Sequence, residues 1–291
     1  MIKSKLLSLF LLSSPLDNME RNPEESPNKR VKRAKLSPRV EELAVIKIKV
    51  GDDENNTIEV LTDPMNNCYE YNIGNSLWGA SYELIEHIKG LKKTNFKGNT
   101  IVEIGAGAGA VGMYLWALGA EVTLTDIEYT LPFMNKNVEH NLKQRTSDKR
   151  ATNGLEASCI DWMKHETAKA IREAKGKPFD LIVGAEVSYD SDLHEDLLET
   201  ILILMGPSEK DAQEIRDRKP DPAAIVLLAV PQRDDDEDIV SRAKERGFAT
   251  RLCHIYPASP EHSSSIAIYE LKPPQQKVAI GNIFDSIKAT V

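Results

Sequence analysis

Ile101-Val102-Glu103-Ile104-Gly105-Ala106-Gly107-Ala108-Gly109 is the stretch that decides the fold, and Asp126 closes the next apolar run. A short β-branched strand that runs into glycines, followed by a helix and a second strand ending in an acid, is typical of a parallel βαβ unit that holds a nucleoside. Glycines let the backbone turn sharply against a ligand, and a carboxylate one strand away accepts hydrogen bonds from a ribose diol. The pattern therefore predicts an adenosine-containing ligand.

The glycines alone do not choose between two such ligands, because Gly107, Gly109 and Gly112 also match the dinucleotide pattern G-x-G-x-x-G. Glu103 separates them: a carboxylate beside the loop repels a pyrophosphate but attracts the ammonium and sulfonium of S-adenosylmethionine. We therefore predict S-adenosylmethionine as the cofactor, with Glu103 among the residues that favour it. A nicotinamide-dependent oxidoreductase ranks last, since no His and Lys pair suited to a hydride relay is visible.

Composition narrows the class of protein. The chain has 291 residues, is 41% hydrophobic and carries a formal net charge of -8. An acidic chain is a poor general binder of nucleic acid, and no run approaches the roughly 18 to 20 apolar residues of a membrane span. The cysteines Cys68, Cys159 and Cys253 form no C-x-x-C pair, which indicates reduced thiols in the cytoplasm or nucleus. We expect no metal site, no nucleic-acid partner and no membrane partner.

The chain divides into three parts. Residues 1–40 are expected to be a disordered tail, residues 41–275 one domain, and residues 276–291 a C-terminal tail. The basic cluster Lys29 to Lys35 in the first tail matches a nuclear-import signal, and a solvated tail without an address explains it equally well. Residues 207–222 are polar and charged and are interpreted as a surface insertion.

Hydrophobic periodicity predicts the elements of the domain. Residues 45–50 and 57–61 alternate as two strands of a hairpin, and residues 78–91 have helical spacing. Strands then alternate with helices, the strands at 100–104, 121–125, 156–160, 179–184, 223–230, 250–255 and 265–271 and the helices near 109–118, 130–145, 165–174, 193–205 and 235–246. The fold class is therefore α/β, a doubly wound, seven-stranded, mainly parallel sheet with an N-terminal β-hairpin and helix.

Six ordered blocks of sequence carry a family resemblance. They are Ser76-Leu77-Trp78-Gly79-Ala80, Val102 to Gly112, Leu124-Thr125-Asp126, Asp161-Trp162, Leu181 to Tyr189 and Ile268-Tyr269-Glu270. In this order they resemble the seven-β-strand lysine methyltransferases related to the Hsp70 and valosin-containing-protein methyltransferases. The resemblance spans roughly residues 72–271. It implies a Rossmann-like class I methyltransferase fold with a final antiparallel strand inserted into the sheet, and S-adenosylmethionine as methyl donor.

The resemblance also implies which residues hold the cofactor. Trp78 resembles the tryptophan that covers the methionine end, where an aromatic face attracts the sulfonium. The loop residues Gly105, Ala106 and Gly107 are expected to touch the amino-acid moiety through their backbone, and Asp126 to hold the ribose hydroxyls.

The adenine end of the cofactor is assigned in the same way. Asp161 and Trp162 resemble the pair beside the adenine, where an acid or backbone group binds the exocyclic amine and the indole stacks on the ring. An ordinary core aromatic is the alternative for Trp162. Ala185 follows the fourth strand and is small where the cofactor passes.

Glu186-Val187-Ser188-Tyr189 is the expected catalytic segment. Many members of the resembling family carry Asp-x-x-Tyr here, whereas this chain has the longer glutamate. A lysine amine has a pKa near 10.4, and only its neutral form has a lone pair that attacks a methyl group. We expect Glu186 to bind the incoming ammonium and orient the amine, and Tyr189 to line the channel. The alternative for Glu186 is that it caps a helix at residues 192–204.

These observations predict a methyltransferase that modifies a lysine of a non-histone protein. The substrate is expected to be a protein such as a chaperone, an AAA ATPase or a translation factor, and the enzyme a monomer of the cytoplasm and nucleus. A small-molecule N-methyltransferase would share the cofactor residues and differ in the acceptor pocket. A non-catalytic binding module that keeps the fold is the third reading. The acidic run Asp234 to Asp238 is interpreted as the first turn of a helix, where the helix dipole favours acids.

Overall fold

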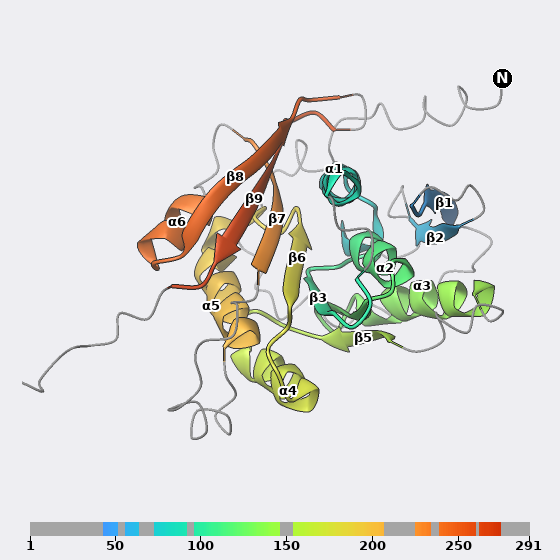
Figure 1. Ribbon diagram of the computed structural model, residues 1–291, viewed down its shortest axis with the longest axis horizontal. Coiled ribbons are helices and arrows are strands. Elements are labelled where there is room, and N and C mark those ends of the chain that lie inside the picture. The colour runs from blue at the N-terminus through green and yellow to red at the C-terminus, as the bar shows by residue number, and fades with distance from the viewer. Residues whose placement is uncertain are drawn as a thin grey trace, which may run out of the picture.

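A seven-stranded sheet forms the centre of the protein (Figure 1). The computed structural model describes residues 43–51, 56–63, 73–91, 96–145, 154–206, 225–233, 239–259 and 262–274. Its sheet strands are β3 (Thr100–Ile104), β4 (Glu121–Asp126), β5 (Leu155–Cys159), β6 (Leu181–Ala185), β7 (Ile225–Pro231), β8 (Ala249–Tyr256) and β9 (Ile266–Lys272). The order across the sheet is β5-β4-β3-β6-β7-β9-β8.

The strand directions confirm the predicted fold class. Neighbouring strands from β5 to β7 are parallel, and β9 runs antiparallel between β7 and β8. The chain moves outward from β3 to β5 and then returns to place β6 on the other side of β3. Ligands of doubly wound sheets bind at the carboxyl ends of the strands beside such a reversal. The fold thus directs attention to the loops that follow β3, β4 and β6.

Helices cover both faces of the sheet. One face carries α1 (Gly79–Gly90), α2 (Ala110–Ala117) and α3 (Leu131–Gln144), and the other carries α4 (His165–Lys175), α5 (His194–Met205) and α6 (Ile239–Glu245). Two short 3-10 turns, η5 (Ile73–Asn75) and η6 (Ser191–Leu193), precede α1 and α5. The adjacent residues Ile182 and Val183 of β6 are both fully buried, in the cores on opposite faces. Such burial on both sides is what makes parallel strands read as continuous apolar runs.

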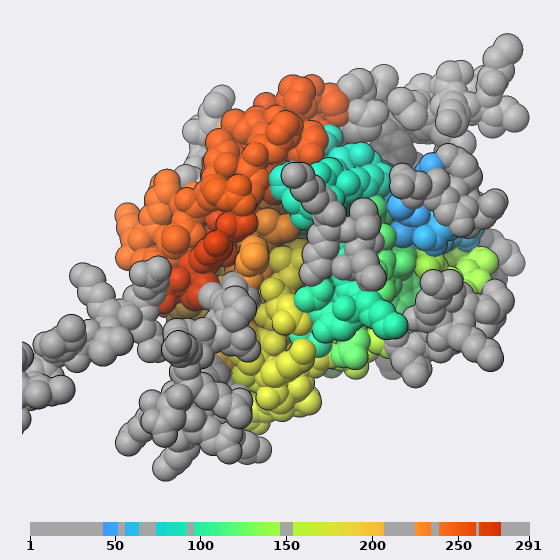
Figure 2. Space-filling view, viewed as in Figure 1, coloured from blue at the N-terminus to red at the C-terminus, as the bar shows by residue number. Residues whose placement is uncertain are grey.

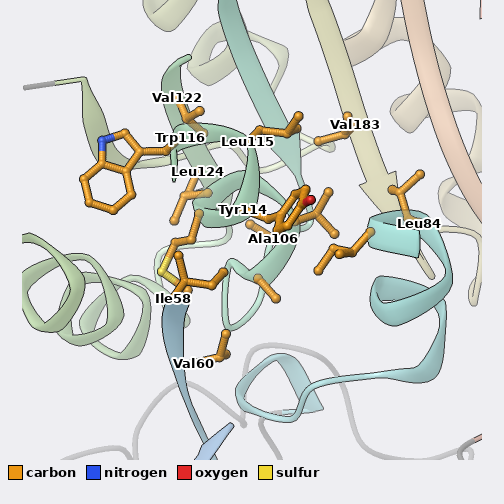
Figure 3. Packing of buried hydrophobic residues seen from close by; sticks show 14 of the residues in the cluster. Ile58, Val60, Leu84, Ala106, Tyr114, Leu115, Trp116, Val122, Leu124 and Val183 are labelled. Carbon is orange, nitrogen blue, oxygen red and sulfur yellow. The ribbon is translucent and has the colours of Figure 1, made fainter. Parts of the chain in front are cut away.

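The N-terminal hairpin forms a separate two-stranded sheet of β1 (Ala44–Lys49) and β2 (Thr57–Thr62). Ile58 and Val60 of β2 lie in the same packed cluster as Tyr114 and Leu115 of α2 (Figure 3). Burial of these aliphatic side chains supplies the hydrophobic contribution that a lone hairpin lacks. The hairpin therefore supports α2, and with α2 the glycine loop at which this helix begins.

Two buried asparagines of α3 hold the hairpin in place. Asn137 accepts a hydrogen bond of 2.7 Å from the Leu61 amide and donates one of 3.0 Å to the Leu61 carbonyl. Asn141 does the same with Glu59, at 3.0 and 2.7 Å. Each side-chain amide thus substitutes for a neighbouring strand and satisfies backbone groups of β2 that would otherwise be buried without partners.

Several expectations lie outside the described residues: the basic cluster Lys29 to Lys35, the insertion at 207–222, the acidic run 234–238 and both tails. Among the residues that the structure describes, no helix has the length and apolar character needed to cross a membrane. The same part of the chain contains no cluster of three His, Cys, Asp or Glu side chains arranged to hold a metal ion.

Candidate functional site

The glycine loop between β3 and α2 is held against the end of β4. The amide of Ala106 donates to the Thr125 carbonyl at 2.9 Å, and the amide of Gly107 donates to Asp126 Oδ2 at 2.8 Å. Gly107 has a φ of +54°, and a Cβ on this residue would lie 2.5 Å from the carbonyl oxygen of Gly74 in η5. Only glycine fits this position, because both the backbone conformation and the close approach exclude a side chain.

Asp126 lies where the sequence predicts it, at the carboxyl end of β4 beside the loop. Besides the bond from Gly107, its Oδ1 accepts a hydrogen bond of 2.8 Å from the Ile127 amide. Burial raises the pKa of this carboxyl group, and the two amide donors partly oppose that rise. A carboxylate has about four lone-pair positions, so Asp126 retains acceptor capacity for a ribose diol. Its predicted role fits this geometry.

Glu103 has a structural contact of its own. Its side chain is 2% exposed, and its Oε2 accepts a hydrogen bond of 2.7 Å from the Gly112 amide in the first turns of α2. Burial raises the pKa of Glu103 to about 8, opposed by that hydrogen bond and reinforced by the charge of Asp126. Glu103 therefore ties β3 to α2 beneath the loop. Its predicted attraction for the cofactor's positive charges stays a prediction.

Trp162 reaches from the end of β5 to the glycine loop. A Cβ on Gly105 would lie 2.9 Å from Val187 Cγ1 and 3.2 Å from Trp162 Cζ2. The half-buried indole therefore meets the loop at Gly105, where Val187 of the segment after β6 also packs. Its neighbour Asp161 accepts a hydrogen bond of 3.1 Å from the Met163 amide and forms an ion pair of 2.8 Å with Lys164. The adenine-binding roles of Asp161 and Trp162 stay predictions.

Two exposed apolar residues beside these acids were not predicted from the sequence. Ile127 follows Asp126 and is 47% exposed, and Met163 follows Trp162 and is 70% exposed. Aliphatic side chains at the carboxyl ends of adjacent strands can pack on the flat face of an adenine. For Ile127, an apolar residue directly after a strand-end acid was the available signal. An acceptor carboxylate, apolar walls and a loop of glycines and alanines together fit an adenosine cofactor.

Glu186 is the residue where the structure departs most from expectation. It follows Ala185, the half-buried last residue of β6, and has a φ of +59°, the one positive φ of a non-glycine residue in the described ranges. Its Oε1 lies 2.8 Å from Nη2 of Arg233, which follows β7. It also accepts a hydrogen bond from the backbone of Ala80. Burial raises the pKa of Glu186, while Arg233 lowers it.

These contacts correct the expected capping alternative. Glu186 contacts the first turn of α1, whose N-cap is Trp78, and the turn that leads into α5 is instead capped by Asp190, which accepts a 3.1 Å bond from the Asp192 amide. The reason is the left-handed backbone of Glu186, which redirects the chain at the end of β6. Glu186, predicted for the acceptor, and Trp78, predicted for the cofactor, thus lie at the same helix start.

Tyr189 lies at the rim, with its side chain 42% exposed. Burial of the hydroxyl raises the pKa of Tyr189, and the carboxylates of Asp126 and Asp190 raise it further. Fully buried His194 supports this segment, because its Nε2 lies 3.1 Å from the Ser188 carbonyl.

Arg233 and His262 are site residues that sequence reasoning missed. His262 lies between β8 and β9, and its Nε2 is 2.9 Å from Oε1 of Glu83 in α1. A Cβ on Gly79 would lie 2.5 Å from that of His262, so the connection packs tightly on the start of α1. Both side chains contact acids far away in sequence, and no local pattern marks them.

Comparison with known proteins identifies the family. The family model described as lysine methyltransferase matches residues 59–221, which include every predicted site residue. The chain belongs to the lysine methyltransferase family. It is 28% identical over 208 residues to mouse protein N-lysine methyltransferase METTL21A, covering 72% of this chain and 82% of the relative. It is 30% identical over 131 residues to EEF1A lysine methyltransferase 3 of Xenopus tropicalis, covering 45% and 52%.

Among solved structures, magnesium protoporphyrin IX methyltransferase of Synechocystis with bound S-adenosylmethionine aligns with 66% of this chain and 77% of its own, at 15% identity and a TM-score of 0.42. The family assignment confirms the sequence reading of an S-adenosylmethionine-dependent lysine methyltransferase. The oxidoreductase, small-molecule and non-catalytic readings are set aside.

Proposed function

We propose that this enzyme methylates a lysine side chain of a non-histone protein and that Glu186 and Tyr189 form its acceptor site. Protein lysines are what the names of its mouse and frog relatives state as their targets, a lysine of EEF1A in the frog case. The expected substrate is a chaperone, an AAA ATPase or a translation factor. The exposed rim around Tyr189 supports a macromolecular acceptor, since a lysine presented by a protein has to reach the site from solvent.

One observation carries the placement of the acceptor. Glu186 lies at the carboxyl end of β6, beside the start of α1, while the groups suited to the adenosine lie at the ends of β4 and β5. The glycine loop after β3 separates the two sets, and β3 lies between β4 and β6 in the sheet. Donor and acceptor groups therefore flank one loop, which supports a short path from methyl group to amine.

The chain's own residues then have distinct tasks. S-adenosylmethionine supplies an electrophilic methyl group when bound, with Trp78, the loop 105–107, Asp126 and Trp162 proposed to hold it. Glu186 accepts a hydrogen bond from the acceptor nitrogen and orients it, and Tyr189 walls the channel with its ring and hydroxyl group. Alignment of reacting groups supplies up to roughly 7 to 11 kcal/mol of barrier lowering, so positioning is the main contribution we assign to this pair.

The direct test is incubation of the full chain with isotope-labelled donor and cell extract, followed by mass spectrometry of labelled proteins. With a substrate so found, Glu186→Gln is expected to lower turnover at least tenfold, equivalent to about 1.4 kcal/mol, with donor affinity unchanged. Tyr189→Phe tests the hydroxyl group separately. Full activity of both variants would remove the acceptor site from this place.

A matched control is available on the other side of the molecule. Glu199 of α5 forms an ion pair of 2.7 Å with Arg246, comparable in distance to that of Glu186 with Arg233. Glu199→Gln removes a carboxylate–arginine pair without touching the carboxyl ends of β3, β4 and β6. It is expected to retain wild-type turnover. A loss of donor binding by Glu186→Gln would instead assign Glu186 to the cofactor.

We also propose that the enzyme acts as a monomer in the cytoplasm and nucleus. The location is supported by the basic cluster Lys29 to Lys35 and by cysteines that form no C-x-x-C pair, whereas the monomeric state is an expectation. Neutralising Lys29, Arg30, Lys32 and Arg33 is expected to lower the nuclear share seen by microscopy. An unchanged distribution would leave the cluster as a solvated tail, and light scattering checks the monomer.

A further inference from the structure

Arg233 is placed so that it decides the charge of the acceptor site. Its Nη2 lies 2.8 Å from Glu186 Oε1, and the two side chains are only 27% and 13% exposed. A pair that is partly shielded from water is screened less than one on the open surface. Glu186 therefore does not present a free negative charge to an incoming ligand. It presents a carboxylate whose charge is balanced by a guanidinium.

The chemistry of the acceptor makes this balance important. A lysine amine in water is almost entirely ammonium at neutral pH, and an ammonium has no lone pair. A lone carboxylate would hold the ammonium and stabilise the unreactive form, whereas a positive charge nearby favours the neutral amine. Arginine stays charged over the whole physiological range, so it acts at every pH at which the enzyme works.

We propose that Arg233 is the charge-balancing residue of the acceptor site: it neutralises Glu186, so that the pocket binds the uncharged lysine amine in preference to the ammonium ion. The inference rests on the proposed position of the acceptor beside Glu186 and Tyr189. The displaced proton leaves to water as the amine enters. The nitrogen then uses its lone pair to bond the methyl carbon as the carbon–sulfur bond breaks, and it takes over the positive charge. Because Arg233 balances Glu186, no net negative charge of the pair holds that charged product in the site.

Other charged groups face the same region. His262, between β8 and β9, contributes a positive charge that lowers the pKa of Glu186 when it is protonated, and it is itself bonded to Glu83 of α1. Asp126 and Asp190 act on the Tyr189 hydroxyl group. Of these groups Arg233 has the largest opposing effect on Glu186. Its removal is therefore the most direct way to unbalance the site.

The first experiment uses butylamine, which has the shape of a lysine side chain. Its binding to the full chain with S-adenosylhomocysteine is followed by NMR at Tyr189 between pH 7 and 10. Wild-type affinity is expected to rise with pH, as the neutral amine becomes available. Arg233→Met is expected to bind at least tenfold more tightly than wild type at pH 7, with little change up to pH 10. The same pH dependence in both proteins would overturn the proposal.

Kinetics with a labelled protein substrate give a second test. In Arg233→Met the acid limb of the pH profile of kcat is expected to move up by about one pH unit. At pH 7.5 kcat therefore falls about tenfold, and KM for the acceptor also falls. Glu186→Gln is expected to change KM in the opposite direction, because it removes the carboxylate that balances the charge of Arg233. A fall of kcat without movement of the limb would show a purely structural role for Arg233.

Three further variants keep the outcome decisive. Arg233→Lys keeps the charge and is expected to stay near the wild-type limb. Glu186→Gln/Arg233→Met restores a neutral pocket and is expected to bring the limb back, even where Arg233→Met alone folds poorly. Arg251→Met is the matched control, since Arg251 pairs with Glu270 at 2.6 Å on the outer strands β8 and β9, which lie at one end of the face in Figure 2.

The outcomes separate this inference from the proposed function. If butylamine fails to affect Tyr189 at any pH and Glu186→Gln keeps full activity, the acceptor lies elsewhere and both proposals fail. If Glu186→Gln lowers turnover but Arg233→Met leaves the pH dependence unchanged, the acceptor site stands and the role of Arg233 is wrong. His262→Gln in each background is expected to leave the shift caused by Arg233→Met in place.

Discussion

At the carboxyl ends of β3 and β4 the site is built from backbone, whereas at those of β6 and β7 it is built from charged side chains. The glycine loop is fixed by hydrogen bonds that the backbone amides of Ala106 and Gly107 donate to Thr125 and Asp126. The segment after β6 is fixed instead by the ion pair of Glu186 with Arg233. A donor shared by a whole family suits the first construction. An acceptor that differs between members suits the second, because side chains can change while the loop stays.

Gly107→Ala should give the largest effect, because it changes the backbone-built half of the site, at the carboxyl ends of β3 and β4. The new Cβ would lie 2.5 Å from the Gly74 carbonyl oxygen at a φ of +54°. Strain and overlap together are expected to cost about 3 kcal/mol, or about a 100-fold loss of donor affinity by calorimetry.

Gly176→Ala is the matched control for that variant. Gly176 ends α4 with a φ of +73°, and nothing lies within 4 Å of its Cβ position. It is expected to lower stability by about 1 to 2 kcal/mol without changing donor affinity. Equal losses of donor affinity in both variants would mean that the contact with Gly74 has no special part in the loop.

Glu103→Gln tests whether the buried acid under the loop is a cost to the fold. Its pKa is raised from 4.5 to about 8, so its favourable contribution is complete below pH 4.5 and is lost as pH rises through 8. Glutamine keeps an acceptor for the Gly112 amide and cannot ionise. The variant's advantage in free energy of unfolding should therefore widen from pH 5 to 8 and level off above, by a few kcal/mol and at most about 5.

Urea titrations at four pH values measure this advantage. Glu166→Gln, at an exposed position in α4, is the control and should show no such trend. An advantage that shrinks toward pH 8 would mean that Glu103 is ionised and well paired in the folded chain. A large loss of donor affinity in Glu103→Gln would instead support the predicted attraction for the cofactor's positive charges.

Asp126→Ala should weaken donor binding by about 1.5 to 3 kcal/mol, the usual loss for hydrogen bonds to a charged group. Part of that loss comes from the Gly107 amide, which loses its 2.8 Å partner. Asp126→Asn keeps an acceptor for that amide and should lose less. Arg233→Met should leave donor affinity unchanged, and an equal loss there would erase the distinction between the two halves. Unchanged affinity in Asp126→Ala would remove Asp126 from the cofactor site.

The backbone-built half is also the half that the sequence predicts well. The first core strand was expected at 100–104 and is Thr100–Ile104, because a strand buried on both faces is mostly apolar, here interrupted by Glu103, and this one ends at its glycines. Asp126 lies at the end of the next strand, as expected. Local periodicity and turn chemistry carry this information within a few residues.

What the sequence did not predict depends on contacts across long separations. Asn137 and Leu61 are 76 residues apart, and Glu186 and Arg233 are 47 apart. Neither pair has a local pattern, since an asparagine in a helix or an arginine after a strand is ordinarily solvated. The left-handed conformation of Glu186 is equally hidden, because glutamate has no preference for it. Such features arise only once the sheet order is set.

Glu186→Asp should have the smallest effect on stability. It tests the backbone conformation at this position and the ion pair with Arg233 together. Aspartate adopts a positive φ more readily than glutamate, which offsets part of the strain at φ +59°. Its shorter side chain weakens the contact with Arg233, so the two changes oppose each other and the net shift should stay within about 1 kcal/mol. Glu186→Ala keeps the strain and loses the pair, and should cost about 2 kcal/mol, less than a fully buried pair because both partners are partly exposed. Urea titration compares the two variants, and the kinetic assay should show partial activity in Glu186→Asp, because many members of the resembling family carry aspartate here. Equal destabilisation by aspartate and alanine would show that the backbone conformation contributes nothing, and that the ion pair alone sets the geometry of the acceptor half.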